Sequence, residues 1–148
     1  MSLSTKIMDE MKNAMREKNT VALEALRAIK SEILLAQTAG GSTEITEADE
    51  IKILQKLVKM RKDSAAIFTT QNRPDLAEPE LAQIAVIEKF LPEQLSEAEV
   101  EAIVSKIIAE TGASGIASMG KVMGLASAQI GGSAEGKTIS TIVKKLLT

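Results

Sequence analysis

The sequence contains no cysteine and no histidine among its 148 residues. It therefore offers no thiolate nucleophile, no disulfide and no histidine-based catalytic triad, and most kinds of zinc site are excluded. Tryptophan and tyrosine are also absent, which leaves Phe68 and Phe90 as the aromatic residues. Because proteins that bind single-stranded nucleic acid stack its bases on aromatic side chains, that mode of binding is excluded as well.

Long apolar runs are missing too. No run approaches the length of about 18 residues that spans a membrane, so we expect no membrane partner. The first residues lack the basic-then-apolar order of a signal peptide, and we expect a cytoplasmic protein. The formal net charge of −2 gives no general attraction for nucleic acid.

Apolar residues make up 45% of the chain and recur with the period of helices, while no segment alternates as a strand does. The pattern predicts an all-α protein in two domains: an N-terminal helical bundle of about four helices in residues 1–91, and a small three-helix C-terminal domain in residues 92–148. Gly40 and Gly41 are expected to end the second helix. The fourth helix is expected to run from about Asp75 to Phe90, with Pro79 tolerated near its start.

Two helix starts carry a capping box, Thr46 with Asp49 and Ser96 with Glu99. The glutamates at the second of these starts are interpreted as capping groups rather than as acid–base catalysts. In the first helix Ile7, Ala14 and the methionines share one face, which is interpreted as core.

The stretch from Met119 to Ile130 predicts a helix with two distinct sides. Its apolar residues form a buried stripe, whereas Gly120 and Gly124 gather about a quarter-turn away with Lys121 beside them. A glycine inside a helix costs roughly 1 kcal/mol relative to alanine, so two of them indicate that something approaches closely. The residues alone favour packing by another helix of the same protein over contact with RNA.

The stretch from Gly131 to Thr138 reads GGSAEGKT and matches the P-loop pattern GxxxxGK[ST]. A P-loop needs a strand before it and a helix after it, so that backbone amides surround the phosphates. Here the preceding segment is helical, and we expect no nucleotide cofactor. Ser133 or Ala134 is expected to begin the last helix, which carries Lys137, Lys144 and Lys145.

Cations are concentrated in the last helices and in one further island, which lies in the third helix and contains Lys52, Lys56 and Lys59. These distributions allow an RNA-contacting module or a protein-interaction module that uses the basic third helix or the methionine-rich first helix. No catalytic constellation is visible, so no catalytic, cofactor-binding or metal-binding residue is predicted.

Several stretches resemble the bacterial YqeY-like proteins across essentially the whole chain. They are LRAIKSEI, KLVKMRKDSA, NRPDLAEPE, EKFLPEQLSEAEV, MGKVMG and EGKTISTIVKKLL, which begin at Leu26, Lys56, Asn72, Glu88, Met119 and Glu135. The same module forms the tail of the B subunit of the glutamyl-tRNA(Gln)/aspartyl-tRNA(Asn) amidotransferase, a carbon–nitrogen ligase with glutamine as amido-nitrogen donor.

The resemblance implies an accessory, all-α module without a catalytic site, whose partner is tRNA or an aminoacyl-tRNA-handling protein. The residues expected to contact RNA are Gly120, Lys121, Gly124, Lys137, Lys144 and Lys145. Family members commonly place cations between MGKVMG and the last helix, whereas the linker from Leu125 to Ala134 carries no charge here. We therefore expect weak binding of phosphate.

Overall fold

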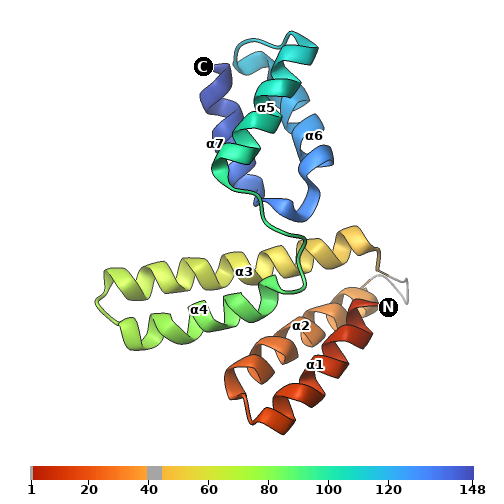
Figure 1. Cartoon of the computed structure of the whole chain (residues 1–148), viewed down its shortest axis with the longest axis vertical. Coiled ribbons are helices and arrows are strands. Elements are labelled where there is room, and N and C mark those ends of the chain that lie inside the picture. Colours follow the sequence, from red (N-terminus) through yellow and green to blue (C-terminus); the bar gives the residue numbers. More distant parts are fainter. Residues whose placement is uncertain (1, 40–44) are drawn as a thin grey trace. The chain divides into compact units, whose positions relative to one another are not determined.

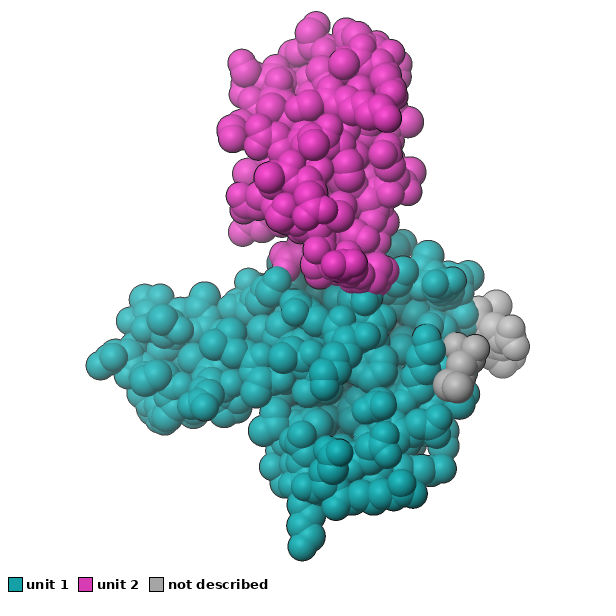
Figure 2. Space-filling model, in the orientation of Figure 1, with its two compact units in different colours: residues 1–91 teal, residues 92–148 magenta. Residues whose placement is uncertain are grey.

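A computed structural model describes residues 2–39 and 45–148. Within that part of the chain seven α-helices are present and no β-strand, so the all-α prediction is confirmed. The chain divides into two compact units, Met1–Leu91 and Pro92–Thr148, which are coloured separately in Figure 2. No helix of the described part is long and apolar enough to cross a membrane.

The first unit contains α1 (Leu3–Glu17), α2 (Thr20–Ala39), α3 (Glu47–Thr70) and α4 (Pro74–Glu88), as Figure 1 shows. Helix α2 contacts the other three, and α3 and α4 lie side by side. Its core is aliphatic, and the largest fully buried side chains are Ile7, Leu26, Ile29, Leu54 and Ile87. The glycines expected to end α2, Gly40 and Gly41, lie outside the described residues.

Local hydrogen bonds set most helix starts in this unit. The Asn19 side chain accepts a hydrogen bond from the Ala22 amide at 3.1 Å and caps α2. The box predicted for α3 is confirmed, because the Thr46 hydroxyl accepts from the Asp49 amide and the Asp49 carboxylate accepts from the Thr46 amide. These bonds lower the pKa of the Asp49 carboxyl below its ordinary value of 3.8, the backbone bond from Thr46 having the largest effect.

Helix α4 starts within one residue of the predicted position, but Pro79 lies further into the helix than expected. The helix begins at Pro74, whose fixed φ suits the first helical position, so Pro79 lies beyond the first turn. Pro79 has no amide hydrogen to donate to the carbonyl of Asp75, four residues earlier. Because Asp75 and Pro79 are both exposed, water can reach this carbonyl. The Arg73 side chain donates two hydrogen bonds, of 3.0 and 2.9 Å, to the Asp75 carboxylate. These hydrogen bonds lower the pKa of Asp75.

Two methionines of α1 are placed differently from the prediction, whereas Met11 packs against the core as expected. The buried side of the helix consists of Leu3, Ile7 and Ala14. Met8 and Met15 are 51% and 54% exposed, so they lie on the solvent side rather than in the core.

The second unit contains α5 (Glu97–Thr111), α6 (Met119–Ile130) and α7 (Gly136–Leu147), with short 3₁₀ turns at Ile116–Ser118 and Gly131–Ser133. The three helices pack against one another around a core that includes Val100, Val104, Val122, Ile139 and Val143. The predicted capping box at the start of α5 is confirmed, since Ser96 and Glu99 bond each other's backbone amides.

Candidate nucleic-acid interface

Helix α6 has a buried side and a solvent side. Val122, Ala126 and Ile130 face the core, while Gly120, Gly124 and Lys121 are exposed. Apart from the nearby backbone of α6 itself, no atom lies within 4 Å of a Cβ atom added to Gly120 or Gly124. Within this unit the glycines therefore form no packing seam, because they lie on a side of α6 that no helix of the unit covers.

Helix α7, which packs against α6, presents its lysines to solvent. Ile139, Val143 and Leu147 are buried, whereas Lys137 and Lys144 are exposed. These two lysines are seven residues apart, which places them on the same side of the helix.

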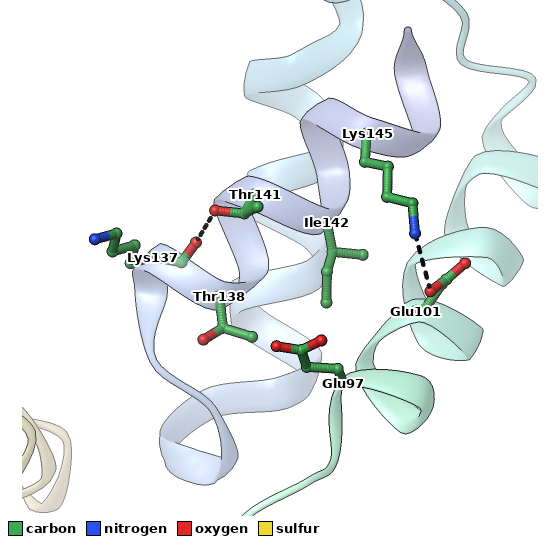
Figure 3. Close-up of a pocket in the computed structure, with 7 residues that line it drawn as sticks. All are labelled: Glu97, Glu101, Lys137, Thr138, Thr141, Ile142 and Lys145. Atoms are coloured by element: carbon green, nitrogen blue, oxygen red, sulfur yellow. Dashed lines mark hydrogen bonds and ion pairs between the residues drawn. The ribbon is translucent and has the colours of Figure 1, made fainter.

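Lys145 is exposed, as expected, and makes an ion pair that the sequence does not indicate. Its ammonium lies 3.8 Å from the Glu101 carboxylate of α5, and Figure 3 shows the two side chains pointing toward each other. A tertiary ion pair of this kind leaves no periodic signal in the sequence. Lys145 therefore lies at the junction of α5 and α7, where its side chain is still 69% exposed. All six residues that are expected to contact RNA lie at the surface.

A shallow depression of about 250 Å³ lies between α5 and α7. Glu97 and Glu101 line its α5 side, and Thr138 and Ile142 line its α7 side (Figure 3). In the figure the Lys137 side chain extends away from these carboxylates. Lys137 and Lys145 also line the depression, so its two carboxylates leave it without an excess of positive charge that would favour phosphate. Its volume is below the ~300 Å³ at which small-molecule sites begin. In the part of the chain that the structure describes, no cluster of acidic residues could hold a metal ion.

In this unit the acidic residues lie mainly on α5, and the lysines lie mainly on α6 and α7. Helix α5 carries Glu97, Glu99, Glu101 and Glu110 with one lysine, Lys106. Helices α6 and α7 carry lysines and no acidic residue, and Glu135 is the acidic residue just before α7. The exposed lysines of α6 and α7 therefore favour an anionic partner, and the glutamates of α5 disfavour one.

The P-loop-like segment, residues 131–138, lies between two helices and not after a strand. The last helix begins at Gly136, so the prediction that Ser133 or Ala134 begins it is wrong. Gly131–Ser133 forms a 3₁₀ turn, and Ala134 is extended with φ −153° and ψ 156°.

The carbonyls of this turn explain why the helix starts late. The Leu95 amide donates to the Ser133 carbonyl at 2.8 Å, and the Gln94 side-chain amide donates to the Gly132 carbonyl at 2.8 Å. The same Gln94 nitrogen also donates to the Pro92 carbonyl. The turn is thus held by the segment that enters α5, through the carbonyls of Gly132 and Ser133.

Gln94 is a residue that the sequence alone does not single out. The available signal is its place in FLPEQLS, between a proline at the boundary of the two units and a serine that caps the next helix. Its distance of 38 residues from Gly132 makes the interaction invisible to local pattern arguments.

Together these features define an all-helical protein whose C-terminal unit exposes glycines on α6 and lysines on α6 and α7. The chain matches the family described as "Yqey-like protein" over residues 4–147, and it belongs to that family.

Curated relatives are similar over much of the chain. A protein of Pyrenophora tritici-repentis is 35% identical over 87% of this chain and 71% of its own length. A protein of Clavispora lusitaniae is 37% identical over 72% of this chain and 61% of its own length. A third, from Lachancea thermotolerans, is 31% identical over 68% of this chain and 55% of its own length. All three are named "Altered inheritance of mitochondria protein 41, mitochondrial", a name that gives a location and no activity.

Proposed function

We propose that the protein is an accessory module that contacts structured RNA, in particular tRNA, through the solvent side of α6 and α7. The observation that carries the proposal is the open glycine surface at Gly120 and Gly124. In an exposed helix these residues reduce stability and are not needed for packing inside the unit. A flat surface kept free of side chains allows a sugar–phosphate backbone to approach.

Lysines around this surface supply the attraction. Lys121 lies beside the glycines, and Lys137 and Lys144 are exposed on the adjoining helix. Contacts to phosphate position a protein on structured RNA without stacking on aromatic rings, which this chain lacks in this unit. The uncharged linker from Leu125 to Ala134 limits how many phosphates can be neutralised, so the expected Kd is on the order of tens of micromolar at physiological salt.

The proposal includes the family's relation to the tRNA-dependent amidotransferase, with no catalytic site in this chain itself. The partner is tRNA or a protein that handles aminoacyl-tRNA. The expected location is cytoplasmic, although the relatives are named as mitochondrial. Either location fits, because the proposal needs only a compartment in which tRNA is present.

The test is tRNA binding by Gly124→Leu. Leucine at this position blocks close approach, and it leaves the fold intact because it extends into open space and favours the helix. We expect binding to fall about tenfold while the melting temperature stays the same or rises. Ala109→Leu, at an exposed position of α5, is the matched control. Unchanged tRNA affinity in Gly124→Leu would refute contact at the glycine surface.

A further inference from the structure

Helix α3 has a solvent side that neither the core nor the proposed RNA contact uses. Its buried side consists of Leu54, Leu57, Val58 and Ala65. On the opposite side Lys52, Lys56 and Lys59 are exposed, and their spacing of four and three residues places them in one stripe.

Along the helix the stripe changes from positively charged to largely apolar side chains. It continues from the lysines to Met60 and Ile67, which are 54% and 56% exposed. Asp63 lies between these two apolar side chains. From Lys52 to Ile67 the stripe extends over roughly 22 Å at about 1.5 Å per residue.

A shallow depression lies at the apolar end of the stripe. It has a volume of about 240 Å³ and is lined by Ala66, Ile67, Thr70 and Gln71. Single exposed apolar residues are ordinary on protein surfaces. Here, however, two of them follow three lysines on one helix face, and the second of them borders a hollow that can receive an apolar side chain.

We propose that this face of α3 binds an acidic amphipathic helix of a protein partner. Carboxylates of the partner pair with Lys52, Lys56 and Lys59, and its apolar residues cover Met60 and Ile67. This is helix-on-surface recognition, in which apolar anchors recur at helical spacing. RNA would use the lysines and leave both apolar side chains exposed to water, so the surface fits a protein better. The inference does not depend on the proposed function, because it concerns the other unit.

The probe is a synthetic, stapled helical peptide of about 16 residues, long enough to cover the stripe and constrained because short helices are marginal in water. One face carries glutamates along half of its length and leucines along the rest. A peptide of the same composition in scrambled order controls for charge alone. Fluorescence anisotropy with the full-length protein is expected to show saturable binding of the amphipathic peptide and much weaker binding of the scrambled one.

Two sets of substitutions separate the contributions. Reversing the charges in Lys52→Glu/Lys56→Glu/Lys59→Glu removes three surface ion pairs, and we expect about tenfold weaker binding. Met60→Ser/Ile67→Ser removes the apolar contacts and is expected to weaken binding by about the same factor. Because all five side chains are exposed, both proteins should melt close to the wild-type temperature.

Matched controls place the same changes on α1 and α2. The charge control reverses three exposed cations, Lys12, Arg27 and Lys30, and the apolar control replaces Met15 and Leu35 by serine. Both controls should bind the peptide within about twofold of wild type.

Three results would overturn the inference: no binding of the amphipathic peptide, equal binding of the scrambled peptide, or an equal loss of affinity in the α1 and α2 controls. A tRNA affinity that falls with the α3 charge reversal but not with its control, without peptide binding, would identify the face as an RNA contact instead. The proposed RNA contact at α6 and α7 is tested by substitutions in the other unit, so the two proposals fail separately.

Discussion

Gly124 lies in the middle of α6, surrounded on its outer side by open space. A glycine there lowers helix stability, and no neighbour in the unit benefits from the missing side chain. Gly112 is different, because it ends α5 in a left-handed conformation with φ 65° that other residues rarely adopt. The two glycines therefore respond in opposite ways to the same substitution.

Gly124→Ala should raise the free energy of unfolding by about 0.4–1 kcal/mol. Gly112→Ala should lower it by about 1–2 kcal/mol, since a Cβ is strained in the left-handed region. Urea denaturation followed by circular dichroism measures both changes. A destabilised Gly124→Ala would mean that Gly124 serves packing within the protein after all.

Among elements, the helices and the capped starts of α3 and α5 were predictable because their signals are local. The capping boxes of Thr46 with Asp49 and of Ser96 with Glu99 involve residues three apart, and the structure contains both. The apolar side of α6 likewise follows from a period that any helix imposes.

Features set by contacts between elements could not be predicted. The late start of α7 depends on Leu95 and Gln94, which lie far from it in sequence. The partner of Lys145 is on another helix. Met11 packs against the core while Met8 and Met15 are exposed, and this division depends on how α1 packs against α2. For the candidate interface, the residues on α6 were proposed from the sequence, and the structure was needed to distinguish an open surface from one packed within the unit.

Gln94 links the entry of α5 to the turn between α6 and α7. Gln94→Ala should destabilise the second unit by about 1–2 kcal/mol, because it removes two hydrogen bonds that contribute roughly 0.5–1.5 kcal/mol each. Thermal unfolding measures this effect, with Glu93→Ala at the exposed neighbouring position as the control. Equal melting temperatures for the two variants would show that the link is not structural.

At the scale of the whole molecule, the chain forms two compact units that meet in sequence at Leu91 and Pro92. Each has its own aliphatic core. We predict that the two units are independent domains. Residues 92–148 expressed alone should then be helical and should unfold cooperatively. A fragment that is unfolded in isolation would show instead that the second unit needs the first.

The two candidate binding surfaces lie on different units. Helices α6 and α7 present lysines around a bare glycine surface, and α3 presents lysines followed by apolar side chains. Because the net charge of −2 is small, neither surface acts through the overall field of the protein, and each depends on its own local groups.

The central claim, RNA contact through α6 and α7, is tested most directly by a salt titration of tRNA binding. Lys121→Glu/Lys144→Glu should weaken binding and reduce the slope of log K against log salt by about 0.7–0.9 for each phosphate that the protein no longer neutralises. The control is Lys106→Glu, which reverses a charge on α5, the helix that carries the glutamates. Lys106 lies 4.0 Å from Glu110, and its substitution should leave the slope unchanged. No measurable association of wild-type protein with tRNA at about 50 mM salt, or an equal change of slope in the control, would contradict the account.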